Sequence, residues 1–147
     1  MEGDGKMKIS TKGRYALRML IDLAEHQSDG YVALKDIASR QDISKKYLEQ
    51  IVPILNKNGI LKTNRGFQGG YMLAKGASKL SVGEILRLTE DSLSPTDYDE
   101  QEQNGIERVM IPVWQELDRV INRYLDSVTI QDILDSKREQ YANDYMI

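Results

Sequence analysis

The sequence predicts a mainly α-helical fold that carries one small β-hairpin. Three stretches of the 147-residue chain lead to this prediction. Residues 34–55 have the apolar spacing of two short helices, residues 60–74 read as two short strands around a glycine-rich centre, and residues 106–125 repeat apolar side chains at helical spacing. Two helices and a hairpin in this order are typical of a winged helix-turn-helix domain, here followed by a long helix.

Composition excludes several classes of protein. The chain holds no run of about 18 apolar residues that could span a membrane, and its start lacks the apolar segment of a secretory signal. It has no cysteine, which excludes disulfides and cysteine-ligated iron–sulfur clusters. We therefore expect a cytoplasmic protein without a cofactor.

Charge divides the chain into a basic and an acidic part. The net charge is −3, but residues 1–88 carry 15 basic against 9 acidic side chains, whereas residues 89–147 carry 5 against 14. Because basic side chains neutralise phosphates, the division is typical of a first part that binds DNA. Chance clustering of solvated charge is the alternative.

The first expected helix follows a short polar leader, residues 1–7, which we expect to be disordered. Ser10 or Thr11 is suited to cap this helix, and its apolar side chains recur from Leu17 to Ala24. Basic residues gather at its start, where a helix N-terminus favours anions. They indicate either a contact with a DNA phosphate or a solvated basic face. The candidate DNA-binding residues are Lys8, Ser10, Thr11, Lys12, Arg14 and Tyr15, with Arg18 beside them.

Two short helices joined by a tight turn at residues 42–43 come next. Ser44 is the expected N-cap of the second helix, and Asn58-Gly59 is typical of its end. Pro53 predicts a bend near residue 49 or an early end, although the apolar spacing continues to Leu55. The outer face is long and polar, as in a helix that reads the major groove. The candidates on it are Ser44, Lys45, Lys46, Tyr47, Glu49 and Gln50.

The hairpin is expected from residues 60–63 and 71–74, around the glycine-rich segment 64–70. An arginine flanked by glycines can enter a narrow minor groove, because the backbone then comes close to the DNA. The candidate residues of this wing are Arg65, Gly66, Gln68, Gly69 and Tyr71.

The second half of the chain predicts three further segments. Ser81 and Glu84 form a capping box that opens a helix, and residues 91–105 should be an exposed acidic loop. A long helix follows, and Pro112 fits best if its regular part begins at about Ile111. A small domain cannot cover so long an apolar stripe, whereas a second copy of the chain can. The candidate dimer contacts are Val113, Trp114, Leu117, Val120, Ile121, Tyr124 and Leu125.

The expected organisation follows from these segments. Residues 8–90 form a DNA-binding domain, residues 91–105 the acidic loop, and residues 106–128 a dimerisation helix. Residues 129–147 add one short helix and, from Tyr141, a tail.

Five spaced motifs recur in one known family. They are residues 7–16, Ile43-Ser44 with Tyr-Leu-Glu-Gln at 47–50, Asn58-Gly59, Arg65-Gly66 with Gly-Gly-Tyr at 69–71, and Pro-Val-Trp at 112–114. From residue 7 onward the chain resembles the bacterial winged-helix transcriptional regulators that include the iron–sulfur cluster regulator IscR and the cysteine-metabolism repressor CymR. The resemblance implies a homodimer that binds a pseudo-palindromic operator, and we expect a repressor. It also implies that Tyr47, Glu49 and Gln50 enter the major groove and that Arg65 reaches the minor groove.

The chain departs from this family at the acidic loop. Cluster-binding members carry three cysteines there, whereas Tyr98 and Arg108 stand where cysteines would be expected. With Asp97 they are the candidate effector-loop residues. Either the protein senses nothing redox-active, or it senses through a partner such as a metabolic enzyme, as the CymR-like members do.

The remaining groups of polar residues give weaker indications of a metal site or of catalysis. Asp97, Asp99, Glu100 and Glu102 have the oxygen ligands of a hard cation but no loop signature, so a solvated charge run is the favoured interpretation and no metal site is expected. His26, near the end of the first helix, is typical of a partner for the helix dipole. No set of nucleophile, base or metal ligands indicates an enzyme.

Overall fold

The computed structural model describes residues 8–66 and 69–145. Eight elements carry the fold: α1 (Thr11–His26), α2 (Leu34–Gln41), α3 (Lys45–Lys57), β1 (Leu61–Thr63), β2 (Tyr71–Leu73), α4 (Val82–Thr89), α5 (Gly105–Ser127) and α6 (Ile130–Tyr145). Two single 3-10 turns, η1 (Gln27–Asp29) and η2 (Ala77–Lys79), join them. The mainly α-helical fold with a small hairpin is confirmed.

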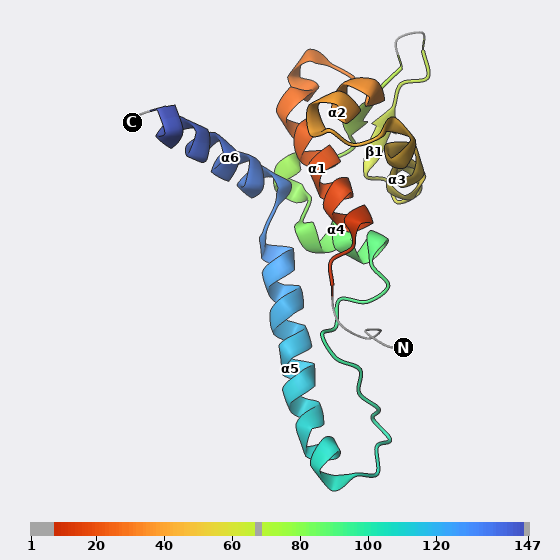
Figure 1. Cartoon of the computed structure of the whole chain (residues 1–147), viewed down its shortest axis with the longest axis vertical. Helices are drawn as coiled ribbons and strands as arrows, with labels where there is room; N and C mark the ends of the chain where they lie inside the picture. The colour runs from red at the N-terminus through yellow and green to blue at the C-terminus, as the bar shows by residue number, and fades with distance from the viewer. Residues whose placement is uncertain (1–7, 67–68, 146–147) are drawn as a thin grey trace.

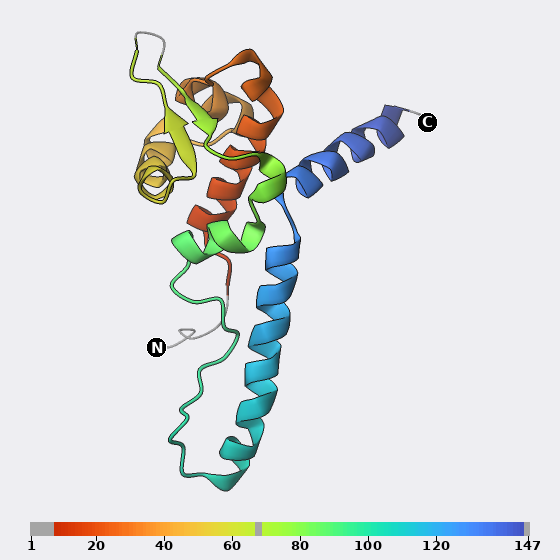
Figure 2. The same ribbon diagram turned by 180° about the vertical axis from the view of Figure 1, so that it is seen from behind.

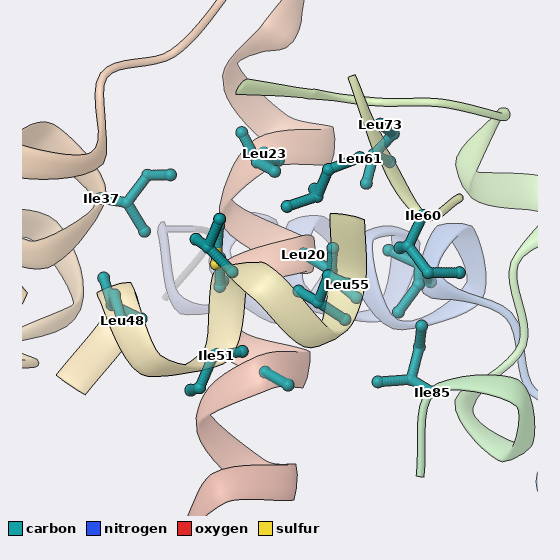
Figure 3. Close-up of a cluster of buried hydrophobic side chains, with 14 of the residues drawn as sticks. Leu20, Leu23, Ile37, Leu48, Ile51, Leu55, Ile60, Leu61, Leu73 and Ile85 are labelled. Carbon is teal, nitrogen blue, oxygen red and sulfur yellow. The ribbon is translucent and has the colours of Figure 1, made fainter. Parts of the chain in front are cut away.

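Helix α1 lies at the centre of the body formed by residues 8–90 and forms the middle of the core. Figure 3 shows Leu20 and Leu23 of α1 among side chains of α2, α3, the hairpin and α4. These side chains are fully or almost fully removed from water, and each contributes roughly 1.5–3 kcal/mol by burial. The apolar spacing of α2 and α3 therefore serves to pack them on α1.

Serine and asparagine caps set where the helices begin. Ser10, Ser44 and Ser81 each accept a hydrogen bond from the backbone N–H three residues further on, at 2.9–3.0 Å. The expected caps at Ser44 and Ser81 are confirmed, and Ser10, one of the two expected candidates, caps α1. The Glu84 carboxylate accepts from Lys75 Nζ (2.9 and 3.1 Å), so the expected capping box is formed only in its serine half. Helix α3 continues through Pro53, whose side chain is exposed, to Lys57.

The hairpin is antiparallel and pairs Leu61 with Leu73, Lys62 with Met72, and Thr63 with Tyr71. Its strands are one residue shorter than expected at their outer ends. Tyr71 also bridges Val32, which precedes α2, through backbone hydrogen bonds of 2.8 and 2.9 Å. The hairpin is thus attached to the helix-turn-helix and not only to its own turn.

The long helix was expected over residues 106–128 with its regular part beginning at about Ile111, and that later start of the regular part is wrong. Helix α5 begins at Gly105, because the Asn104 side chain accepts from the backbone N–H groups of Ile106 (2.9 Å) and Glu107 (3.0 Å). Pro112 then lies inside the helix with an exposed side chain, where water can hydrate the carbonyl that loses its partner.

The expected short last helix is also wrong, since α6 runs to Tyr145 and includes most of the predicted tail. Its first turns pack on α1, where Ile130 and Leu134 are buried. Figures 1 and 2 show its second half leaving the body of the molecule on one side, while α5 extends away from that body. The acidic loop, residues 91–104 in the structure, runs beside α5.

No helix in the described part of the chain is long and apolar enough to cross a membrane.

Candidate nucleic-acid interface

The N-terminus of α1 presents a group of exposed basic side chains. Lys8, Lys12 and Arg14 are exposed, and the first turn of the helix contains no acidic residue. Thr11 is exposed as well and accepts a hydrogen bond from Arg14 Nη2 at 3.2 Å. Positive side chains at the positive end of a helix dipole form a surface suited to a phosphate. Ser10, another candidate named from the sequence, uses its hydroxyl as the cap of α1.

Helix α3 presents its polar face to solvent. The side chains of Ser44, Lys45, Lys46, Glu49 and Gln50 are exposed, whereas Leu48, Ile51, Val52 and Leu55 on the other side are buried. The face is therefore free to enter a DNA groove, with Ser44 at its N-terminal end.

Tyr47 and Tyr15 join α3 to α1. Their rings meet edge to face, with centroids 5.3 Å apart and planes at 69°. Arg18 of α1 lies over the Tyr15 ring, 5.1 Å from its centroid. These contacts set the distance between the basic end of α1 and the polar face of α3.

The wing begins with an arginine whose backbone is held by its neighbours. Asn64 Oδ1 accepts from Gly66 N–H at 2.9 Å, and Gly69 N–H donates to Gly66 O at 2.9 Å, so Arg65 lies exposed inside a hydrogen-bonded loop. Gly70 has φ 121°, and a Cβ there would lie 3.0 Å from the Val32 carbonyl oxygen, which only glycine avoids. Tyr71 is half-buried at the base of the wing. The predicted candidate Gln68 lies outside the described residues.

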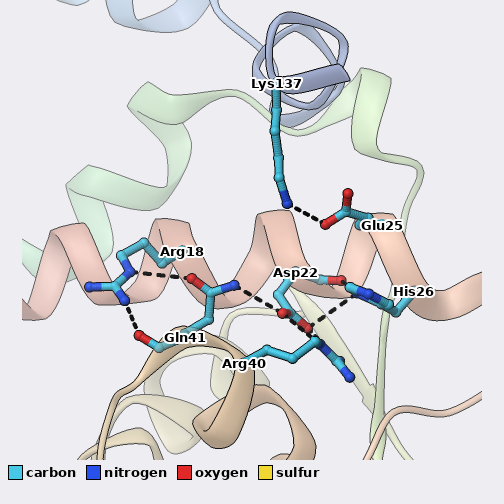
Figure 4. A network of polar contacts seen from close by, with 7 residues as sticks. All are labelled: Arg18, Asp22, Glu25, His26, Arg40, Gln41 and Lys137. Atoms are coloured by element: carbon cyan, nitrogen blue, oxygen red, sulfur yellow. Dashed lines mark hydrogen bonds and ion pairs between the residues drawn. The ribbon is translucent and has the colours of Figure 1, made fainter. Parts of the chain in front are cut away.

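A buried carboxylate holds α2 against α1 (Figure 4). The Asp22 side chain is 1% exposed and accepts from Arg40 Nε (3.0 Å), Arg40 Nη2 (2.7 Å) and Gln41 Nε2 (3.0 Å). Burial opposes ionisation of Asp22, but the hydrogen bonds from Arg40 and Gln41 and the Arg40 charge outweigh it and lower the Asp22 pKa. The same contact raises the pKa of Arg40.

Arg18 belongs to this network and not to the group of exposed basic side chains at the N-terminus of α1. Its guanidinium donates to the backbone carbonyl and to the side chain of Gln41, at the end of α2. The sequence had grouped Arg18 with Lys8, Lys12 and Arg14, because all four are basic and close in the chain. Helical spacing turns Arg18 toward α2, so that grouping is wrong.

His26 Nδ1 lies 2.9 Å from the Asp22 carbonyl oxygen, in the last turn of α1.

Helix α5 carries an exposed apolar stripe. Six of the eight large apolar side chains that are exposed in the described residues lie on it: Ile106, Val109, Val113, Leu117, Val120 and Tyr124. The exposed fractions of Val113, Leu117 and Val120 are 50%, 37% and 47%. Spacings of three and four residues place all six on one side of the helix, as in a helix that packs on another.

The other dimer candidates lie at the edge of this stripe. Trp114, Ile121 and Leu125 are half-buried, and Leu125 packs against the small apolar cluster of α4. An apolar groove runs between α5 and the rest of the chain, lined by Ile9, Leu17, Val82, Leu86, Val120, Ile121, Tyr124 and Leu125. The stripe and the groove are continuous at Val120 and Tyr124.

The candidate effector-loop residues do not converge. Asp97 and Tyr98 line a polar hollow with Asp99, Glu102, Glu107 and Ile111, whereas Arg108 is exposed and does not line it. The Tyr98 hydroxyl donates to Asp118 Oδ2 at 3.5 Å. The loop is thus attached to α5 by hydrogen bonds.

Sequence reasoning missed the roles of Asp22 and Glu90. Asp22 had a visible signal, since it interrupts a run of buried side chains at Met19, Leu20 and Leu23, and a buried carboxylate requires a partner. Glu90 had no such signal, because its partner Ser10 is 80 positions away.

Comparison with known proteins places this geometry in context. Residues 9–136 match the Rrf2 family, described as "Iron-dependent Transcriptional regulator". The chain is 36% identical to the HTH-type transcriptional regulator IscR of Yersinia enterocolitica over 133 residues, which cover 89% of this chain and 81% of that protein.

Solved structures agree with this match. T. potens IscR superposes with a TM-score of 0.74 at 40% identity, covering 91% of this chain and 90% of that one. CymR, the global cysteine regulator of B. subtilis, superposes with a TM-score of 0.72 at 36% identity, covering 88% and 98%.

The donor set of the acidic loop does not fit a thiolate-ligated iron–sulfur cluster. Such clusters are held by cysteine, and the chain contains none. Within residues 8–66 and 69–145, no group of three or more His, Cys, Asp or Glu side chains is arranged to hold a metal ion.

Proposed function

Because the chain belongs to the Rrf2 family of DNA-binding transcriptional regulators, which are not enzymes, we propose that it is a homodimer that binds a pseudo-palindromic operator and represses transcription without an iron–sulfur cluster. The observation that carries the proposal is the placement of three exposed surfaces on one rigid core. They are the basic end of α1, the polar face of α3 and the wing at Arg65.

Each surface has a distinct task in this proposal. Gln50 pairs with adenine, Glu49 accepts from cytosine N4, and Lys46 reaches guanine acceptors in the major groove. Arg65 enters the minor groove, where a narrow A·T-rich segment attracts a guanidinium. Lys12 and Arg14 contact phosphates, which fixes the register of α3 on the DNA.

Dimerisation through α5 doubles these contacts. The exposed stripe of one chain covers that of a second chain, and the two α3 helices then lie about 34 Å apart, one turn of B-DNA. The symmetry of such a dimer explains why the operator should be palindromic.

Substitutions in α3 and in α1 should have different consequences. Glu49→Ala and Gln50→Ala remove base contacts, so we expect each to relax sequence choice and to reduce discrimination by about 1–3 kcal/mol at one position of each half-site. Lys12→Ala and Arg14→Ala remove phosphate contacts, so they should weaken binding to all sequences alike and lower the salt slope by about 1 each. Fluorescence titration of matched and single-base-changed duplexes at several salt concentrations measures both quantities.

Lys57→Ala is a suitable control, because Lys57 is exposed at the far end of α3 from Ser44. It should alter neither sequence choice nor discrimination between duplexes. If Glu49→Ala and Gln50→Ala lowered the affinity for all duplexes equally, these residues would contact the DNA backbone, and their base-reading role would be contradicted.

A second candidate function is regulation through a protein partner, such as a metabolic enzyme, that controls DNA binding. The absence of cysteine and the exposed acidic side chains of the loop favour it over a redox cofactor. The exposed Tyr141 on α6 is a further candidate contact. A chain truncated before Tyr141 that keeps its DNA affinity but loses a co-purifying enzyme would support this function.

A further inference from the structure

Glu90 connects the end of α4 to the start of α1. Its backbone N–H donates to Leu86 O at 2.8 Å, and the chain then leaves the helix in an extended conformation. Its carboxylate accepts from the backbone N–H of Ser10 (2.7 Å, Oε1) and from the Ser10 hydroxyl (2.6 Å, Oε2). The Thr89 hydroxyl donates to the same Oε2 at 2.7 Å.

This carboxylate orients the cap of α1. The Ser10 hydroxyl has one proton, which it donates to Glu90, so a lone pair remains directed at Gly13 N–H, 2.9 Å away. A Cβ at Gly13 would lie 2.5 Å from Glu90 Oε2 and 2.9 Å from Thr89 Oγ1. Glycine at this position therefore allows the end of α4 to approach the first turn of α1 closely.

The loop that starts after Glu90 is attached to α5 at its other end. Ser94 Oγ donates to Asp118 Oδ1 at 2.8 Å, and the Tyr98 hydroxyl contacts the other carboxylate oxygen. Between them and Glu90, Leu93 is buried with Val82 and Leu86 of α4. Residues 90–98 thus form a continuous connection between the first turn of α1 and the long helix.

We propose that Glu90 is a positioning residue for DNA binding: it holds the first turn of α1, which carries Lys12 and Arg14, and transmits displacements of the acidic loop to that turn. This inference rests on the proposed function, because it assigns a means of regulating the same DNA contact. In this way a change in the acidic loop can alter DNA binding without an iron–sulfur cluster.

The charge of Glu90 makes the inference testable. Burial opposes ionisation of Glu90, but hydrogen bonds from Ser10 and Thr89 and the nearby Lys12 charge outweigh it and lower the Glu90 pKa, so the group is anionic at neutral pH. A negative charge near phosphates opposes binding, so removal of the charge alone would tighten it. Loss of the positioning contacts would weaken binding. The two effects have opposite signs.

The experiment compares Glu90→Gln with Asp91→Asn in the full chain. Both substitutions remove one negative charge, but the Asp91 side chain is exposed. On a duplex enriched by the wild-type protein, we expect Glu90→Gln to weaken binding about tenfold, and Asp91→Asn to leave it unchanged or slightly tighter. Thr89→Val, which removes one hydrogen bond to Glu90, should weaken binding about threefold and serves if Glu90→Gln does not fold.

Hydrogen exchange supplies a readout that a purely electrostatic effect would not change. Exchange at Gly13 N–H should be faster in Glu90→Gln than in the wild type. Added DNA should slow exchange in residues 91–98 of the wild type but not of Glu90→Gln, because coupling between two sites is reciprocal.

Failure of the proposed function and failure of the positioning role of Glu90 give different results. If the wild-type protein enriches no DNA, the proposed function itself fails. If the wild type binds DNA while Glu90→Gln binds as tightly as Asp91→Asn and exchanges at the wild-type rate, Glu90 has no positioning role and this inference is overturned.

Discussion

Replacing Leu117 with glutamate is expected to yield a monomer whose affinity for the operator is about a thousandfold lower, because a dimer gains most of its affinity from two linked half-sites. Leu117 lies within the exposed stripe of α5, one turn from Val113 and close to Val120. In a two-fold dimer the substitution buries two carboxylates without partners, which costs several kcal/mol. Sedimentation equilibrium gives the mass of the variant, and titration of the operator gives its affinity.

Arg119→Gln is the matched control. It changes the net charge by the same amount as Leu117→Glu, but Arg119 lies two residues further along α5, on the polar side, where it is 63% exposed and pairs with Glu116 at 3.2 Å. We expect this variant to remain a dimer and to bind with nearly unchanged affinity. A dimeric Leu117→Glu protein with wild-type affinity would show that the stripe does not form the dimer.

Asp22→Asn should cause the largest loss of stability among single polar substitutions in α1, α2 and α3. Asparagine keeps the volume of the side chain but cannot accept both hydrogen bonds from Arg40, and its amide group faces the guanidinium. We expect a loss of about 2 kcal/mol and a Tm lower by about 4–8 °C, measured by circular dichroism. Asp36→Asn, on the exposed side of α2, should change the Tm by about 1 °C or less.

The effect of Asp22→Asn should depend on pH with a defined sign. The Asp22 pKa is lowered in the folded protein, so the unfolded chain binds the proton more readily, and the stabilisation by the carboxylate is present above the unfolded pKa. It is lost as the pH falls through the folded pKa. The difference in Tm between wild type and variant should be full at pH 7 and should shrink below about pH 4. A difference that is constant across this range would assign the loss to packing and not to the carboxylate.

Local chemistry explains why much of the fold was predictable from the sequence. Ser10, Ser44 and Ser81 cap helices through contacts with residues three positions away, so their role is visible in a short segment. The expectation that the regular part of α5 begins only at about Ile111 was wrong for a related reason. Pro112 is a strong local signal, but the Asn104 cap before it and an exposed position on the helix outweigh the single backbone hydrogen bond that proline removes.

Long-range contacts explain what could not be predicted. Arg18 is basic and lies near Lys12 and Arg14 in the sequence, yet its partner Gln41 is 23 positions away and turns it toward α2. Glu90 contacts Ser10 only because α4 packs on α1. The exposed candidates Lys12, Glu49, Gln50 and Arg65 were named from the sequence, and their contacts with DNA stay predictions.

A bind-and-sequence selection of the purified protein on fragmented genomic DNA of its source, at about 150 mM salt to suppress non-specific binding, would show whether the protein reads a symmetric site. We predict enrichment of a two-fold-symmetric site whose half-sites are about 10 base pairs apart, centre to centre, or a multiple of that distance. The genes beside it would then be tested for increased transcription when the protein is absent. Enrichment of no sequence, or of a site without symmetry, would contradict a homodimer that reads DNA by itself.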